Sequence, residues 1–287
     1  MKRNLQLLII DPQNDFCDLP SAYLARDART GAPITPALPV PGAHADMLRI
    51  ASLINNGAAG LSAITITLDA HHRYDIAHPT FWMDGNGAAV AAFTSISAAA
   101  VRAGQFQPRS KAALPRALAY LDALEAEGRY QLMIWPVHCE IGSWGQNVHA
   151  DVRAAYNAWE EQSLSVVSKV NKGSNPWTEH YSAVRAEVPD SSDADTQLNQ
   201  DLITALSLAD RIYICGEAAS HCVKATTEHI VENFTPEMRS KLVLLTDCMS
   251  PVTGFDAQYE SFVADMRDRG VQIAQANDVL AELLANT

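Results

Sequence analysis

The chain reads Arg211-Ile-Tyr-Ile-Cys-Gly-Glu-Ala-Ala-Ser-His-Cys222-Val-Lys-Ala-Thr226 at the point that decides its predicted fold. The apolar run Arg211–Cys215 is typical of a buried β-strand, and Gly216 ends it before a helix predicted to begin near His221. Cys222 would then lie at a helix N-terminus, where unpaired N–H groups and the helix dipole favour a thiolate and can hold an oxyanion. A purely structural cysteine is the alternative, because buried cysteines are common.

Apolar strand-like runs recur on both sides of this stretch. They are Leu5–Ile10, Leu61–Leu68, Tyr130–Trp135, Leu164–Val170, Leu242–Thr246 and the shorter Val271–Ala274. Helical patterns lie between them at Ala45–Asn55, Asp151–Gln162, Thr196–Ala209, His221–Asn233, Ala257–Arg269 and Asp278–Ala285. Strands that alternate with helices form βαβ units, which build a parallel sheet. We therefore predict an α/β fold with three layers, a mostly parallel β-sheet with helices on both faces.

Two segments interrupt this alternation and are expected to be insertions. Residues 18–42 are rich in Pro, Ala and Gly, and we expect them to form a loop over the crevice at the end of the sheet. Residues 84–128 contain the Ala-rich Ala88–Gln107 and then a helical pattern at Ala112–Glu127. The Ala-rich tract is interpreted as a lid or an oligomer contact, or as a surface excursion without a role. Without internal repeats or a separating linker, residues 1–287 are predicted to form one domain.

The composition excludes several classes of partner. The 21 basic and 33 acidic residues give a net charge of −12, which argues against nucleic acid and anionic membranes. No apolar run approaches the roughly 18 residues that cross a bilayer. Met1-Lys-Arg-Asn leads straight into a predicted strand, so we expect no cleaved signal. Five cysteines, an odd number, fit a reducing compartment better than a disulfide framework, so a cytoplasmic location is expected.

Two further strands are predicted to end in residues that can act on a ligand. Leu7-Leu-Ile-Ile-Asp11 is a short strand that ends in a carboxylate, and the C-terminal ends of parallel strands line the ligand crevice. Val166-Val-Ser-Lys-Val-Asn-Lys172 runs into a Lys-Gly turn, where the lysine could hold a thiolate and a carboxylate together by charge. Taken singly, Asp11 is more simply a turn cap and Lys172 a solvated surface group.

A third strand carries residue types that bind metals. In Ile64-Thr-Ile-Thr-Leu-Asp69-Ala-His71, the side chains of Asp69 and His71 are two apart and project to the same side of an extended chain. A carboxylate and an imidazole together suit a borderline divalent cation. His78 and His138 follow in segments that contain proline, and each is a further candidate ligand, although a lone histidine is more often a surface or core residue.

Five motifs in these segments point to one family. Asp11-Pro-Gln-Asn-Asp-Phe16 matches Asp-x-Gln-x-Asp-Phe, and Trp135-Pro-Val-His-Cys139 matches Trp-Pro-x-His-Cys. A Gly-Ser-Trp-Gly stretch follows the second motif and is similar to Gly-Thr-x-Gly. The Lys172-Gly pair is followed by Tyr181-Ser182, and Cys222-Val-Lys-Ala-Thr226 matches Cys-Val-x-x-Thr. In this order, over nearly the whole chain, they resemble the cysteine hydrolases of the isochorismatase-like superfamily, and within it the nicotinamidases. The resemblance implies the same three-layer α/β fold.

The resemblance also implies a catalytic apparatus. The family's triad would fall on Asp11, Lys172 and Cys222, and it would hydrolyse an amide through a thioester on the cysteine. The backbone N–H groups of Ala218 and Cys222 would hold the oxyanion, beside a cis peptide bond after Glu217.

A metal ion and a ring-binding pocket follow from the same resemblance. One divalent ion, zinc first with iron or manganese as alternatives, would be bound by Asp69, His71 and His138. His78 would be a further ligand, although its spacing from His71 differs from that in many relatives. A flat ring would be enclosed by Phe16, Trp135 and Tyr181, with Trp82 and Trp177 as additional candidates.

The implied reaction converts nicotinamide to nicotinate and ammonia, as in NAD salvage. The expected partners are a small-molecule amide and further copies of the chain in a homo-oligomer. Two departures keep other functions open: the turn reads Gly216-Glu-Ala-Ala-Ser-His before Cys222 instead of Gly-x-Ala-Thr-Asp-x, and the chain is long for a nicotinamidase. The first alternative is a related amidase acting on a carbamoyl, ureido or other heterocyclic amide. The second is a noncatalytic, metal-stabilised scaffold.

Overall fold

The centre of the fold is a parallel β-sheet, seen in a computed structural model that describes residues 2–287. Its strands are β1 (Leu5–Ile10), β2 (Ala63–Asp69), β7 (Ser168–Lys172), β8 (Arg211–Gly216), β9 (Leu242–Leu245) and β10 (Gln272–Ala274). They lie in the order β10-β9-β8-β1-β2-β7, and every neighbouring pair is parallel. The predicted parallel sheet is therefore confirmed.

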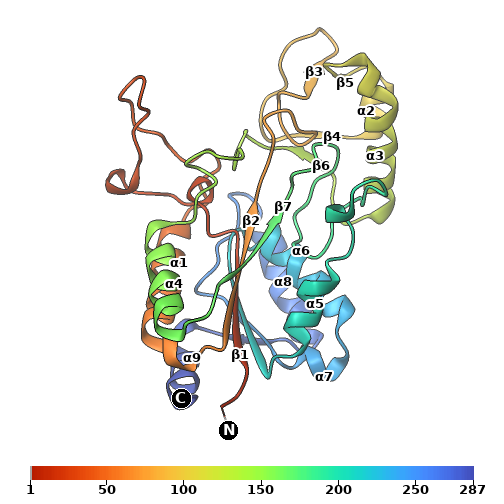
Figure 1. The fold of residues 1–287 in the computed structure, drawn as a ribbon. Coiled ribbons are helices and arrows are strands. Elements are labelled where there is room, and N and C mark those ends of the chain that lie inside the picture. Colours follow the sequence, from red (N-terminus) through yellow and green to blue (C-terminus); the bar gives the residue numbers. More distant parts are fainter. Residues whose placement is uncertain (1) are drawn as a thin grey trace.

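Helices cover both faces of this sheet (Figure 1). On one side lie α1 (Ala43–Gly57), α4 (Ala150–Ser163) and α9 (Ala276–Ala285), and on the other lie α5 (Gln200–Ser207), α6 (Cys222–Asn233), α7 (Pro236–Arg239) and α8 (Asp256–Asp268). Every residue of β1 is buried, as expected for a continuous apolar strand that is covered on both faces. The three-layer α/β architecture is thus confirmed. No helix in residues 2–287 has both the length and the apolar character needed to cross a membrane.

Two predicted strands differ from the observed ones. Residues of Tyr130–Trp135 form β6 (Leu132–Ile134), which lies outside the main sheet and pairs antiparallel with β4 (Thr94–Ile96). A short apolar run does not specify its partner, so periodicity could not exclude the main sheet. The run Leu164–Val170 begins its strand only at Ser168, because Leu164 still caps α4 with a left-handed backbone.

Residues 82–134 form a small lobe beside the end of the sheet (Figure 1). It contains β3 (Trp82–Asp84) paired with β5 (Phe106–Pro108), the β4 and β6 pair, α2 (Ala98–Arg102) and α3 (Leu114–Glu127). Its last helix was predicted, but β3, β4 and β5 were not, because three residues are too few to show the alternation of a strand. The division into one domain with insertions at 18–42 and 84–128 remains our proposal.

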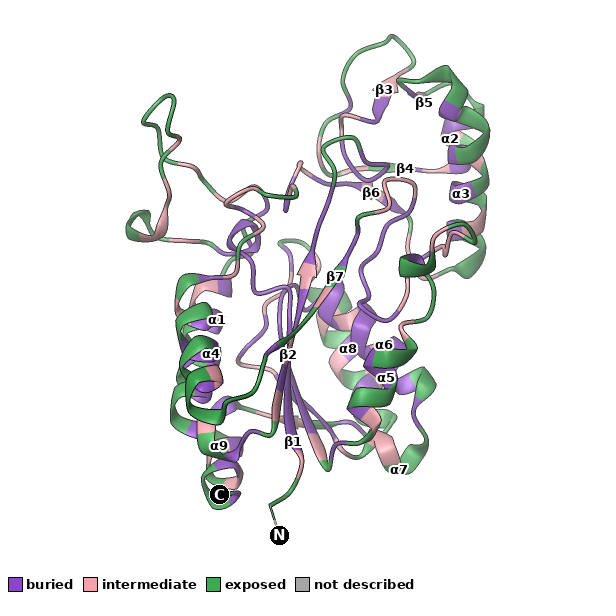
Figure 2. Cartoon of the chain, in the orientation of Figure 1, coloured by how far each residue is buried: buried purple, intermediate pink, exposed green. Residues whose placement is uncertain are grey.

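The segment 18–42 returns to the sheet only at its end. Its middle part projects from the body and is largely exposed (Figures 1 and 2). Near the end, the Leu38 N–H donates to the Asp15 carbonyl at 3.0 Å and the Val40 N–H to the Phe16 carbonyl at 2.9 Å. These bonds hold the buried Leu38 beside the loop that follows β1.

Gly216, which joins β8 to the turn before Cys222, permits a close approach between two backbones. Its φ is +114°, and a Cβ added there would lie 2.0 Å from the Ile10 carbonyl oxygen. We expect Gly216→Ala to lower the free energy of unfolding by more than about 2 kcal/mol, because β1 cannot move aside. Denaturant unfolding would measure the loss. Gly128→Ala is the matched control, since Gly128 has φ +68° but nothing within 4 Å; equal losses would contradict the close-contact explanation.

Candidate active site

The carboxyl ends of three strands meet the start of α6 at one end of the sheet. Asp11 directly follows β1, Asp69 ends β2, Lys172 ends β7, and Cys222 is the first residue of α6. Asp69 and Lys172 are register partners in neighbouring strands. All four side chains are buried. The structure therefore brings together the residues that the sequence placed at separate strand ends.

Lys172 lies at the centre of this group. Its Nζ is 2.9 Å from Asp11 Oδ2, 3.1 Å from Asp69 Oδ1 and 3.5 Å from Cys222 Sγ. Burial disfavours the ammonium, but the two carboxylates outweigh this effect and hold the pKa of Lys172 well above its usual value. The lysine is a permanent cation between the two carboxylates and the sulfur.

The Asp11 carboxyl is fixed by Thr67, a residue of β2 that sequence analysis did not single out. Asp11 has a left-handed backbone with φ 44°, and its Oδ1 accepts a 2.5 Å hydrogen bond from Thr67 Oγ1. Its Oδ2 is paired with the Lys172 ammonium at 2.9 Å. Burial raises the pKa of Asp11 although Lys172 opposes the shift. A fixed carboxylate with a raised pKa is suited to accept a proton.

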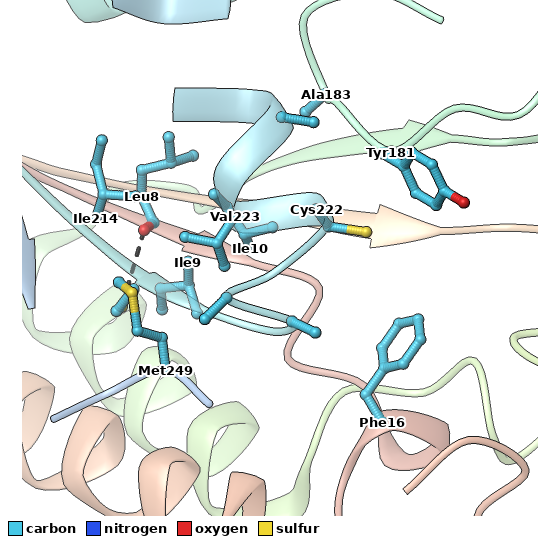
Figure 3. Packing of buried hydrophobic residues seen from close by; sticks show 14 of the residues in the cluster. Leu8, Ile9, Ile10, Phe16, Tyr181, Ala183, Ile214, Cys222, Val223 and Met249 are labelled. Atoms are coloured by element: carbon cyan, nitrogen blue, oxygen red, sulfur yellow. Dashed lines mark hydrogen bonds between the residues drawn. The ribbon is translucent and has the colours of Figure 1, made fainter. Parts of the chain in front are cut away.

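Burial and neighbouring charges act in opposite directions on the Cys222 sulfur. Burial raises its pKa well above the usual value, and Asp11 and Asp69 add to the shift while Lys172 opposes it. Burial therefore opposes the thiolate that the helix N-terminus was expected to favour, and the thiolate remains a prediction. Figure 3 shows the sulfur pointing toward the space between Phe16 and Tyr181. Attack by this sulfur requires a base, and Asp11 is its neighbour.

The turn before Cys222 leaves two N–H groups free. The Glu217–Ala218 peptide bond is cis, as the resemblance implied. The neighbouring N–H groups of Glu217 and Ala219 donate to Ile10 and Ser250 carbonyls, whereas those of Ala218 and Cys222 have no acceptor in the described part of the chain. Ala218 and Cys222 also line a small cavity in front of the Cys222 sulfur. The two free N–H groups are thus available for an oxyanion.

Three histidines beside Lys172 form a cluster that can bind a metal. Their ligand atoms all lie within 4.8 Å of one another, and the cluster consists of His71, His78 and His138. Asp69 Oδ2 lies 3.1 Å from His71 Nε2 and 3.3 Å from His138 Nε2. The structure thus joins the three predicted ligands and adds His78, which the sequence left open.

The hydrogen bonds around the cluster suit a divalent cation. Each histidine turns its Nδ1 toward an oxygen: His71 to Asp75 Oδ2 at 3.1 Å, His138 to the Pro136 carbonyl at 2.8 Å, and His78 to the His72 carbonyl at 3.2 Å. These contacts fix the rings, and His78 Nε2 lies 3.4 Å from His138 Nδ1, so nitrogens of all three rings converge where a metal could bind. A set of imidazole and carboxylate ligands fits zinc, iron or manganese.

Two acidic residues near the cluster were missed by sequence reasoning. Asp75 orients His71, and only its spacing of four residues from that histidine could have suggested a link. Glu179 lines the small cavity in front of Cys222, and its buried Oε2 has no hydrogen-bond partner in residues 2–287. An unpaired buried carboxyl oxygen is costly, so a cation beside it would be stabilising.

We expect His71→Ala and His78→Ala each to weaken metal binding by about tenfold or more, because each removes one ligand from the cluster. Metal analysis of protein purified without chelator, followed by competition with a chromogenic chelator, would measure the change. His44→Ala is the matched control, since His44 pairs with His149 elsewhere in the fold. No stoichiometric metal in the wild-type protein would contradict the proposed site.

A small cavity opens in front of Cys222. Phe16, Trp135 and Tyr181 all line it, and Trp135 Nε1 donates to the Tyr181 hydroxyl at 3.0 Å. Trp82 and Trp177 do not line it. The free space is only about 20 Å³, so a ring can enter only when lining side chains shift.

Comparisons with known proteins agree with this fold. No protein-family model matches the chain, and no curated protein matches it in sequence. Among solved structures, a nicotinamidase/pyrazinamidase of Acinetobacter baumanii is 19% identical with a TM-score of 0.60, and the match covers 96% of this chain and 98% of that one. A pyrazinamidase of Pyrococcus horikoshii in complex with zinc is 18% identical with a TM-score of 0.54, covering 95% and 99%. An isochorismatase family protein of Desulfovibrio vulgaris is 17% identical with a TM-score of 0.50, covering 99% of both chains.

These matches define the class of fold. The chain has the fold of the isochorismatase-like α/β hydrolases, and nicotinamidases and pyrazinamidases are among the structures that share it. The fold implied by the sequence motifs is therefore confirmed.

Proposed function

We propose that this protein is an amidohydrolase that releases ammonia from a small aromatic or heteroaromatic carboxamide, with nicotinamide as the first candidate. The observation that carries the proposal is the arrangement around Lys172, whose Nζ lies within 3.5 Å of Asp11, Asp69 and the Cys222 sulfur. A scaffold would have no need to bury a thiol, a base and a cation together. The nicotinamidase folds described above support the substrate class.

In the first half of the proposed reaction, Asp11 accepts the thiol proton as Cys222 Sγ attacks the carboxamide carbon. Lys172 stabilises the charges that form on the carboxylate and the sulfur. The oxyanion accepts hydrogen bonds from the free N–H groups of Ala218 and Cys222. When the tetrahedral intermediate collapses, the C–N bond breaks and Asp11 returns its proton to the departing ammonia.

In the second half, water hydrolyses the thioester. Asp11 again acts as the base, and the reaction yields the carboxylic acid and the free Cys222 thiol. Phe16, Trp135 and Tyr181 would orient the ring of the acyl group between them. A divalent cation held by Asp69, His71, His78 and His138 would supply a coordination position for a ring nitrogen. Participation in NAD salvage, a cytoplasmic location and a homo-oligomeric state are further parts of this proposal.

Ammonia release from a panel of amides tests the function. We expect nicotinamide to be turned over in a metal-dependent manner, with pyrazinamide and several ureido and carbamoyl compounds measured alongside. Turnover of another panel member alone would change the substrate and keep the reaction class. Absence of turnover across the panel by protein with bound metal would contradict the proposed function.

A further inference from the structure

A second cavity adjoins the catalytic one and has no role in the proposed reaction. It has a volume of about 560 Å³ and shares Tyr181 and His221 with the catalytic cavity. We call this cavity the outer pocket. Among its lining residues are Arg129, Tyr130, Tyr181, His221, Lys224 and Phe255. A volume of this size suits a small organic group.

The outer pocket is positively charged in a strongly acidic protein. The chain has 33 acidic and 21 basic residues, yet within residues 2–287 no aspartate or glutamate lines this pocket. Two cations do line it, Arg129 and Lys224. The remaining polar lining residues are neutral hydrogen-bonding groups, among them Ser95, Gln131, Gln258 and Ser261. A cationic cavity of this kind favours an anionic ligand.

The two cations keep hydrogen-bonding capacity for a ligand. Both pair with the same carboxylate: Arg129 Nη2 lies 2.7 Å from Glu228 Oε2, and Lys224 Nζ lies 2.9 Å from Glu228 Oε1. A further acid, Glu187, faces Arg129, and burial raises its pKa to about 7 although Arg129 opposes the shift. With a pKa of about 7, Glu187 carries only part of a negative charge at neutral pH. Arg129 Nη1 also contacts His229 Nε2 and Lys224 Nζ lies 3.4 Å from the Tyr130 hydroxyl, and the remaining N–H groups of the two cations are unused.

His221 places a neutral donor between the two cavities. The Val252 N–H donates to Ser220 Oγ at 3.1 Å, and Ser220 Oγ lies 2.9 Å from His221 Nδ1. Burial lowers the pKa of His221 to about 3, so the ring is neutral. In the tautomer protonated on Nε2, the Ser220 hydroxyl donates to Nδ1 and the Nε2 hydrogen is left for a ligand. Ser220 stands where the family pattern has Asp, whereas His221 falls on a variable position of that pattern.

The catalytic cavity and the outer pocket differ greatly in the space that they offer a substrate. The catalytic cavity has about 20 Å³ of free space, against about 560 Å³ in the outer pocket. Tyr181 and His221 form the wall that the two cavities share. The outer pocket therefore offers space, on the far side of this wall, for an additional group on a substrate whose amide lies at Cys222.

We propose that the outer pocket is a subsite for a carboxylate on the acyl part of the substrate, bound by Arg129 and Lys224 past the His221 donor. Given the proposed amide hydrolysis, on which this inference rests, the preferred substrates are amides that carry a second, anionic group. Nicotinamide lacks that group and would fill only the catalytic cavity. Paired cationic donors and a neutral donor recognise a carboxylate better than a neutral substituent.

The test compares two ligands that differ only in a carboxylate. Benzamide and 3-carbamoylbenzoate would be titrated by calorimetry into metal-loaded Cys222→Ala protein, which cannot form the thioester. We expect 3-carbamoylbenzoate to bind about tenfold tighter or more. Adding Arg129→Met or Lys224→Met is expected to remove that preference. Arg102→Met is the matched control, because Arg102 pairs with Asp122 and lines neither cavity.

Equal affinities for the two ligands, or a preference that survives both substitutions, would overturn the subsite. The two variants act independently, so misfolding of one, checked by circular dichroism, leaves the other informative. Ammonia release by the wild-type protein separates this proposal from the function itself. Turnover without a carboxylate preference would sink the subsite alone, whereas a carboxylate preference in binding without turnover of any amide would retain the subsite and sink the hydrolysis.

Discussion

Replacing Cys222 by alanine is expected to lower kcat for ammonia release by about five orders of magnitude. The thiol is the one nucleophile that the site presents to the amide carbon. Its sulfur faces the cavity between Phe16 and Tyr181 and lies 3.5 Å from the Lys172 ammonium. Without it, Asp11 has no thiol to deprotonate and no thioester can form. Steady-state assays on metal-loaded protein would measure the loss.

A second buried cysteine provides the control for this experiment. Cys215 belongs to β8, and its sulfur lies 3.8 Å from the carbonyl oxygen of Leu8 in the neighbouring strand β1. Cys215→Ala removes a sulfur of similar burial that does not face the cavity, so we expect turnover within about threefold of wild type once folding is verified. Retention of the wild-type rate by Cys222→Ala would refute the thioester mechanism. Equal losses in both variants would point to general damage from removing a buried thiol.

The elements that position the site were predictable because each strand is an apolar run with a polar end. Asp11, Asp69 and Lys172 were placed at strand ends by sequence alone, and parallel pairing of those strands then brings the ends together. The structure places these side chains at the same end of the sheet as Cys222. The predicted three-layer α/β fold followed from the same alternation of strands and helices.

Other parts of the site depend on distances that a sequence pattern does not contain. Arg129, His221 and Lys224 come from different segments, and only the folded small lobe and α6 bring them to one pocket. Glu179 lies in a loop without periodicity, so nothing in the sequence indicated that its carboxyl would be buried. The pKa of Cys222 depends on the same kind of information, because the desolvation of its sulfur is set by packing and not by its place in the helix.

Removing the Lys172 charge is expected to cost both stability and activity. In Lys172→Met, a side chain of similar length leaves the buried carboxylates of Asp11 and Asp69 without their shared cation. Breaking a buried ion pair from one side typically costs about 3–5 kcal/mol, and we expect a loss of unfolding free energy in that range. Urea unfolding of metal-free protein would measure it, since a bound cation would partly compensate Asp69.

The pH dependence of this loss distinguishes charge from packing. The Lys172 charge lowers the pKa of Asp11, whereas burial raises it. Without Lys172 the effect of burial is less opposed, so the pKa of Asp11 rises further above its value in the unfolded chain. A group with a raised native pKa binds protons preferentially in the folded state, so the deficit is expected to shrink as the pH is lowered toward about 5. Lys169→Met on the same strand is the matched control, because Lys169 is exposed and lies only over the Tyr156 ring. A stability loss that is independent of pH, or equal in the two variants, would mean that Lys172 stabilises the fold through packing. It would contradict the assigned role of the Lys172 charge in setting the pKa of Asp11.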